Sequence, residues 1–190
     1  MHRLQNLFLL TVTLIASPFA LAQEWTTLFD GSGLENFNRL GDAEWNIIED
    51  YVESDGYRGS YLVTREDYGD FELEVEFWPS ADANSGIYVR NTSGEKIAAD
   101  AGYEINIFDT NDNPDNRTGA IIFFAPPMVE IIAGEKWNTY KIRAEGSRIT
   151  AHLNGTLVAD LDDDTYASGP IALQANGGLI RFRNVRVRPL

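Results

Sequence analysis

Residues 84–90 read N-S-G-I-Y-V-R and residues 102–109 read G-Y-E-I-N-I-F-D, so in both stretches aliphatic and polar side chains alternate. Side chains of a β-strand point alternately to opposite faces of the sheet. The two stretches therefore predict two strands that each turn one aliphatic face toward a core. The opposite face is expected to gather four side chains of different chemistry: Tyr88, Arg90, Glu104 and Asn106.

This polar face has two interpretations. A cation, a carboxylate, an amide and an aromatic ring on one sheet face are the groups that a sugar-binding or sugar-cleaving surface needs. Alternatively, the face is the solvated outside of an antiparallel sheet, where Arg90 and Glu104 form an ordinary cross-strand ion pair. The alternation by itself favours neither interpretation.

Further strands are expected on both sides of these two. The clearest is F-E-L-E-V-E-F-W at 71–78, in which apolar residues alternate with glutamates. Asn154-Gly155 predicts a tight type I′ hairpin turn. Segments 169–175 and 179–187 are expected to form a closing hairpin. No segment has a sustained helical period, so roughly a dozen short strands predict an all-β sandwich of two antiparallel sheets.

The first residues, 1–22, have the features of a secretory signal peptide. One arginine precedes an apolar run over 7–16, and A-L-A at 20–22 supplies a small-x-small cleavage signal. The run is shorter than the ~20 apolar residues that a membrane span needs. We therefore expect residues 23–190 to form a single β-sandwich domain, exported to the periplasm or secreted, and not held in a membrane after cleavage.

Composition excludes several classes of function. The formal net charge of −14 argues against nucleic acid and anionic lipid as partners, and favours a neutral ligand or a cation. The absence of cysteine excludes thiol catalysis and Cys-ligated zinc. His2 and His152 are the only histidines, so a multi-His metal site and a Ser-His-Asp triad are nearly excluded.

Two more residues are candidates for a site. His152 lies between Ala151 and Leu153, so its side chain points away from the apolar face and is expected at the surface or at the rim of a site. The loop D-T-N-D-N-P-D-N, which begins at Asp109, is rich in the oxygen ligands that calcium prefers, so Asp109 is a candidate calcium ligand. This loop lacks the central Gly and terminal Glu of an EF-hand, and an Asn- and Asp-rich turn is the simpler interpretation. No other cofactor is predicted.

Ten segments follow one another in the order of a known family. Through them, nearly the whole of the chain after residue 22 resembles the 3-keto-disaccharide hydrolase family, which implies a concanavalin-like jelly-roll sandwich. Besides the two stretches quoted first, the segments are L-F-D-G-S-G-L-E-N-F (28–37), W-N-I-I-E-D (45–50), Y-G-D-F-E-L-E-V-E-F (68–77), T-G-A-I (118–121), K-W-N-T-Y-K-I (136–142), H-L-N-G (152–155), G-P-I-A-L-Q-A-N-G (169–177) and R-F-R-N-V-R-V (181–187).

Members of this family are associated with cleaving glycosides that carry a ketone at C3. Such a ketone acidifies the C2 proton, so that a carboxylate can remove it and the C1 substituent can leave by β-elimination, after which water adds back. The resemblance implies that Glu104 is the base and that Arg90 positions the substrate or stabilises the enolate. It also implies a substrate-binding set: Tyr88, Asn106, Gln174, Asn176, Asn84 and His152.

Two positions depart from the family pattern. Asn106 occupies a position where the family commonly has Gln, and Asn176 occupies one where it commonly has His. Loss of that His removes an acid–base group. Three hypotheses therefore remain open at this point: an exported glycoside-cleaving enzyme, a non-catalytic carbohydrate-binding module of the same fold, and a structural or interaction protein.

Overall fold

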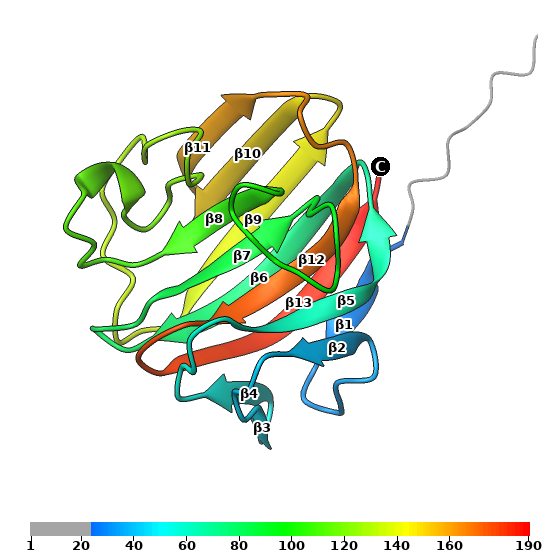
Figure 1. The fold of residues 1–190 in the computed structure, drawn as a ribbon. Coiled ribbons are helices and arrows are strands. Elements are labelled where there is room, and N and C mark those ends of the chain that lie inside the picture. Colours follow the sequence, from blue (N-terminus) through cyan, green and yellow to red (C-terminus); the bar gives the residue numbers. More distant parts are fainter. Residues whose placement is uncertain (1–23) are drawn as a thin grey trace, which may run out of the picture.

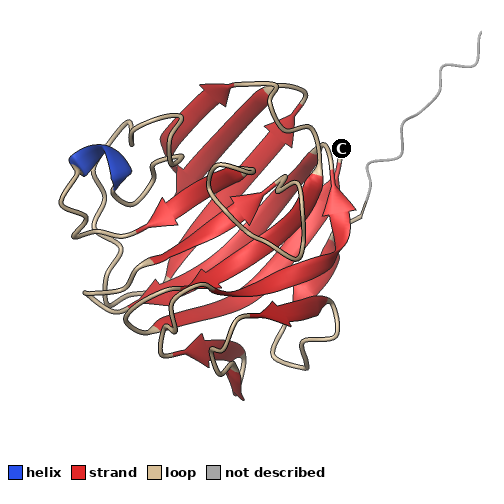
Figure 2. Cartoon of the chain, viewed as in Figure 1, coloured by secondary structure: helices blue, strands red, loops and turns tan. Residues whose placement is uncertain are grey.

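The computed structural model describes residues 24–190, which fold into two antiparallel sheets packed face to face (Figure 1). Figure 2 shows that the regular structure in this part of the chain is almost all β-strand, with a single short helix, η1 (Pro114–Asn116). The all-β sandwich predicted from the sequence is confirmed. The predicted signal peptide, residues 1–22, lies outside the described residues.

Within residues 24–190, no helix has the length and apolar character that crossing a membrane requires.

The larger sheet has eight strands. Their order is β11–β10–β9–β6–β13–β4–β3, and β1 pairs with β13 beside this path. The strands are β1 (Thr26–Phe29), β3 (Asn46–Ile48), β4 (Tyr51–Ser54), β6 (Phe71–Pro79), β9 (Asn138–Glu145), β10 (Arg148–Leu153), β11 (Thr156–Asp162) and β13 (Ile180–Pro189).

The smaller sheet has five strands in the order β2–β5–β12–β7–β8. The strands are β2 (Phe37–Leu40), β5 (Ser60–Tyr68), β7 (Ser85–Val89), β8 (Tyr103–Ile107) and β12 (Gly169–Ala175). The two stretches that predicted strands, 84–90 and 102–109, are thus neighbours, and they form one edge of this sheet.

The turn residues predict one connection between strands correctly and another one incorrectly. Asn154 and Gly155 both have positive φ, 51° and 84°, which confirms the predicted I′-type turn between β10 and β11. The predicted closing hairpin is wrong, because β12 pairs with β5 and β7 whereas β13 pairs with β1, β4 and β6. Four residues, 176–179, carry the chain from one sheet to the other, and a Gly-rich link is compatible with either path.

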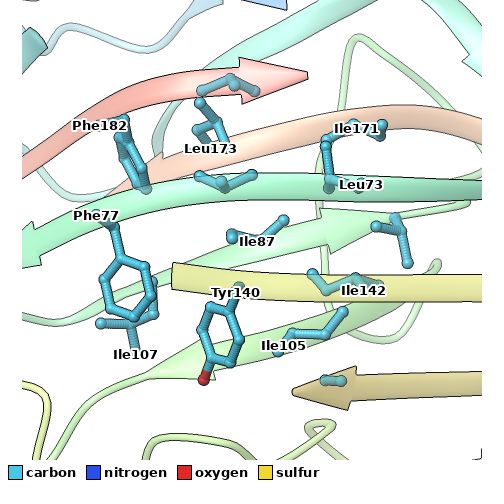
Figure 3. Packing of buried hydrophobic residues seen from close by; sticks show 14 of the residues in the cluster. Leu73, Phe77, Ile87, Ile105, Ile107, Tyr140, Ile142, Ile171, Leu173 and Phe182 are labelled. Carbon is cyan, nitrogen blue, oxygen red and sulfur yellow. The ribbon is translucent and has the colours of Figure 1, made fainter. Parts of the chain in front are cut away.

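The inner faces of the two sheets enclose one hydrophobic core. Phe77 of β6 stacks on Tyr140 of β9, with ring centroids 4.9 Å apart. The aliphatic faces of β7 and β8 pack into this core, as their alternation predicted. Figure 3 shows side chains from both sheets meeting there: Leu73, Phe77, Ile87, Ile105, Ile107, Tyr140, Ile142, Ile171, Leu173 and Phe182.

The outer face of the five-stranded sheet is partly covered. The loop between β7 and β8 folds back over it (Figure 1), and Ile97 of this loop packs on the sheet. Its partners there are Tyr61, Val63, Tyr88 and Ala172. This second, small cluster covers the middle of the sheet. Tyr88 is therefore held in place by the covering loop as well as by its own strand. The candidate site lies next to it.

Candidate active site

A hollow of about 260 Å³ lies on the outer face of the five-stranded sheet, over β12, β7 and β8. Segment 108–123, which follows β8, supplies its outer wall. Among the described residues, its lining contains a single ionisable carboxylate, several amides, aromatic rings and one aliphatic side chain, and no cation. The lining residues are Asn84, Tyr88, Glu104, Asn106, Phe108, Asn111, Asn116, Ile122, Phe123, Gln174 and Asn176.

Strand register brings the chemical groups of this hollow together. Tyr88 lies directly opposite Glu104 in the β7–β8 pair and directly opposite Ala172 in the β12–β7 pair. Gly86, two residues before Tyr88, shares the same face and has no side chain. A Cβ at this position would come within 2.9 Å of a Glu104 carboxylate oxygen, so Gly86 leaves the space in which that carboxylate lies.

Glu104 is nearly buried, with 7% of its surface exposed. Burial raises the pKa of Glu104 to about 7, and hydrogen bonding with the Tyr88 hydroxyl offsets this only in part. No cation contributes to this pKa. A carboxylate that is about half ionised near neutral pH can both take and return a proton, as a general base and acid must.

Gln174 organises the hydroxyl of Tyr88. Its Nε2 donates to the Tyr88 oxygen at 2.9 Å, which leaves the Tyr88 hydrogen to be donated to the Glu104 carboxylate. Burial and the nearby Glu104 carboxylate raise the pKa of Tyr88, which keeps the phenol protonated. The Oε1 atom of Gln174 is buried and has no partner among the described residues. This oxygen is an acceptor for which a sugar hydroxyl would be a suitable donor.

The asparagines of the hollow are each used in part by the fold. Asn106 donates its side-chain amide to the carbonyl of Asn116, which holds the outer wall against β8. Asn176 accepts a hydrogen bond from the amide of Gly59 through its Oδ1 at 3.0 Å. Asn84 forms a backbone bridge with Gly177. The remaining side-chain groups of these residues line the hollow and are available to a ligand.

Arg90 does not lie on this face, and the prediction that placed it there is corrected. Its φ of 53° ends the strand alternation after Val89 and turns the side chain away. The guanidinium is buried, where it donates to the carbonyls of Gly69 and Gly146 at 2.9 and 2.8 Å and to Asp70 at 2.9 Å. Arg90 therefore forms no ion pair with Glu104. With a further hydrogen bond to the carbonyl of Tyr166 at 3.4 Å, it holds three connections of the sandwich together.

His152 is also elsewhere, which corrects its assignment to the substrate-binding set. It lies on β10, and it lines a larger hollow of about 600 Å³ on the outer face of the eight-stranded sheet. The charges of that larger hollow pair with one another: Arg143 and Arg188 with Glu72, and Lys141 and Arg186 with Glu74. The smaller hollow around Glu104 is the better candidate for chemistry, because its carboxylate has no such partner.

Asp109 has a structural role that replaces the one expected for it. One carboxylate oxygen accepts from the Thr118 hydroxyl at 2.5 Å, and the other accepts from the amides of Ala133 and Gly134 at 2.9 and 2.8 Å. These bonds use the oxygens that calcium would need. Within residues 24–190, no group of three or more His, Cys, Asp or Glu side chains is placed to hold a metal ion.

Five residues of the hollow were not assigned to the site from sequence. The sequence alone could have placed Phe108 at the site, because Phe108 continues the polar face of β8. Asn111 and Asn116 belong to the Asn- and Asp-rich loop after Asp109, for which the sequence predicts a turn or a calcium site. Ile122 and Phe123 lie in an apolar run, yet 76% of the Phe123 surface is exposed. An apolar run predicts burial, so nothing in the sequence indicated an exposed ring here.

Comparison with known proteins agrees with the fold and identifies the family. Residues 24–188 match the profile of the 3-keto-alpha-glucoside-1,2-lyase-like domain. A candidate glycosyl hydrolase from Parabacteroides distasonis has 26% sequence identity and a TM-score of 0.76, covering 88% of this chain and 100% of that one. No curated protein matches the chain.

Two more distant structures share the fold. The carbohydrate-binding module CBM66 from Bacillus subtilis has 20% identity and a TM-score of 0.62, covering 88% of this chain and 96% of that one. The β-glucanase of Bacillus licheniformis has 10% identity and a TM-score of 0.56, covering 90% and 99%. With a concanavalin-like sandwich and a family profile that spans nearly all described residues, the chain belongs to the family of 3-keto-alpha-glucoside-1,2-lyase-like domains.

Proposed function

We propose that this protein is an exported enzyme that cleaves glycosides already oxidised to a ketone at C3, with Glu104 as the base. Family membership supports the substrate class, and the features of residues 1–22 support export. One observation carries the proposal: Glu104 is nearly buried, has no cationic partner, and has a pKa of about 7. These are the properties required of a group that removes a carbon-bound proton at neutral pH.

The reaction needs no external oxidant or reductant. The Glu104 carboxylate takes the C2 proton, and the electron pair of the broken C–H bond forms an enolate with the C3 ketone. When the ketone re-forms, this pair becomes a C1=C2 double bond and the bond from C1 to the leaving oxygen breaks. That oxygen takes a proton, which Glu104 now holds, so the products are an unsaturated keto sugar and an alcohol. Addition of water to the double bond then gives the free keto sugar.

Neutral donors must stabilise the enolate, because Arg90 lies outside the hollow. The Tyr88 hydroxyl suits this role once Glu104 has taken the C2 proton, since the hydrogen that it donated to the carboxylate can then turn to the enolate oxygen while Gln174 still holds the Tyr88 oxygen. The amide nitrogen of Asn176 is a second donor at the edge of the hollow. Donors that are already fixed in a partly buried site stabilise developing negative charge without reorganising during the reaction.

Nuclear magnetic resonance in D₂O tests this proposal. A 3-keto-glucoside and its parent glucoside are incubated separately with the wild-type protein. We expect alcohol release and deuterium at C2 only from the keto compound. Equal release from the parent glucoside would show ordinary hydrolysis, and absence of release from either would exclude cleavage of these substrates.

A binding module without catalysis is the second candidate function. Asn176 in place of the histidine common in the family favours it, because the hollow then contains no imidazole to share the proton transfers. Calorimetry distinguishes the two: a module would bind the glucoside measurably while the keto compound stays intact in the resonance experiment.

A further inference from the structure

Phe123 is the most exposed large apolar residue among those described, and it stands at the rim of the hollow that contains Glu104. Its exposed fraction is 76%, so the ring contributes little to the core. A single exposed apolar side chain is ordinary on a protein surface. Its position beside the candidate base, together with its backbone conformation, sets Phe123 apart from other exposed residues.

The backbone of Phe123 is strained. Its φ is 71°, a region that glycine adopts freely and that is unfavourable for a bulky residue. Two hydrogen bonds between Ile121 and Ala125, one in each direction at 2.9 Å, fix the turn around it. The amide of Ile122 donates to the carbonyl of Glu104 at 3.0 Å, which fixes this turn to β8, the strand that carries Glu104. Neither burial nor backbone preference explains a phenylalanine here, and strain of this kind is typical of functional positions.

Two chemically different walls flank Glu104. On the side of β12 and β7 the hollow presents amides, among them Gln174, whose buried Oε1 has no partner in residues 24–190. Beyond the edge of β8 it presents the apolar side chains of Phe108, Ile122 and Phe123 together with the amides of Asn111 and Asn116. The reacting sugar carries the ketone and hydroxyls and matches the amide side. The group attached at C1 then extends toward the aromatic side.

We propose that Phe123 is a specificity-determining residue that stacks on the leaving group, so that the preferred substrates are 3-keto-glycosides whose leaving group has a flat apolar face. A second pyranose ring or an aryl ring has such a face, and a methyl group does not. This inference rests on the proposed function. It goes further by assigning the two ends of the hollow and by naming the class of leaving group.

The test compares an aryl 3-keto-glucoside with methyl 3-keto-glucoside. Phe123→Gly removes the ring and relieves the strain, so the variant is expected to fold with no loss of thermal stability. We expect its kcat/KM for the aryl compound to fall about tenfold, mainly through KM, with little change for the methyl compound. Phe123→Tyr keeps a ring face and should retain the wild-type preference. Met128→Ala is the matched control, because Met128 is also exposed and belongs to a different hollow.

The outcomes separate this inference from the proposed function. If the wild type cleaves both compounds and Phe123→Gly lowers both equally or neither, the stacking role is overturned while the enzyme stands. If the wild type cleaves neither compound, the proposed function fails. Calorimetry with aryl and methyl glucosides then tests the stacking role by itself. If Phe123→Gly loses the tighter binding of the aryl glucoside, the stacking role of Phe123 is supported, and if this preference is unchanged, it is overturned.

Discussion

The chemistry of Glu104 is set by its immediate neighbours. The same side chain on a solvated strand would be fully ionised at neutral pH. Here, burial against Tyr88 and the absence of a cation favour the protonated form and raise its pKa to about 7. Gly86 provides the space for the carboxylate, and Gln174 orients the hydroxyl beside it. Four residues from three adjacent strands therefore account for the properties of one carboxylate.

This pKa makes a prediction about stability. The folded state holds the Glu104 proton more tightly than the unfolded state, so the free energy of unfolding should fall as pH rises from about 4.5 to about 7. Glu104→Gln removes this dependence on pH. The variant should match the wild type near pH 4 and exceed it by roughly 3 kcal/mol at pH 8. Urea denaturation at the two pH values measures the difference. A variant less stable than the wild type at pH 8 would contradict the assigned pKa.

The same ionisation should appear in catalysis. Because only the carboxylate form accepts the C2 proton, kcat/KM is expected to rise with pH and to level off above about 7. The measurement is kcat/KM for a 3-keto-glucoside between pH 5 and 9. A limb with a midpoint near the ordinary pKa of a glutamate would mean that Glu104 is not the base.

Gly86→Ala tests whether the position of the carboxylate matters. The added Cβ would lie 2.9 Å from a Glu104 oxygen and 3.1 Å from its Cγ, so the flexible side chain must move. We expect turnover to fall at least tenfold, with little change in the melting temperature, because misplacement of a reacting group by about 1 Å can cost that much or more. Gly94→Ala is the control, since a Cβ there meets only ordinary contacts of 3.7 Å and longer. Unchanged turnover in Gly86→Ala would argue against Glu104 as the base.

At the scale of the elements, Arg90 is an anchor between connections that are far apart in sequence. Its guanidinium joins the turn at 69–70, the turn at Gly146 and the carbonyl of Tyr166. Removing it leaves buried carbonyls without donors and Asp70 without its cation. Arg90→Met should therefore lower the free energy of unfolding by about 3 kcal/mol, measured by urea denaturation. Arg39→Met, at an exposed position of β2, should change it little, and equal effects would contradict the anchoring role.

The strands also show which parts of the candidate site could be predicted from the sequence. Alternation correctly assigned the inner and outer faces of β7 and β8, and therefore brought Tyr88, Glu104 and Asn106 together. It failed at Arg90, because period-2 alternation holds only while the backbone stays extended, and Arg90 has a positive φ. Phe123 was missed for a related reason. The turn that exposes it is fixed by contacts with β8, which local sequence does not reveal.

At the scale of the molecule, cations are concentrated on the sheet opposite the candidate site. Arginines and a lysine of β9 and β13 pair with the glutamates of β6, and three of the arginines also lie over tryptophan rings. The hollow around Glu104 lacks a cation in its lining, and the chain has a formal net charge of −14. The field at the hollow should therefore disfavour anionic ligands.

A matched pair of ligands tests this expectation. A glucuronide differs from a glucoside by one carboxylate, and we expect it to bind about tenfold more weakly at low ionic strength. The difference should narrow as salt is added, because screening weakens repulsion between charges that are not in contact. Calorimetry at two salt concentrations measures both effects. Tighter binding of the glucuronide would mean that a cation reaches the ligand.

Turnover of a 3-keto-glucoside by the wild type and by Glu104→Gln tests the central claim most directly. The substitution keeps the size of the side chain and removes only its ability to accept a proton. If Glu104 is the base, the variant should keep the wild-type fold by circular dichroism and lose at least ~10²-fold in turnover. A folded variant that retains wild-type turnover would contradict the mechanism, and another group would have to remove the C2 proton.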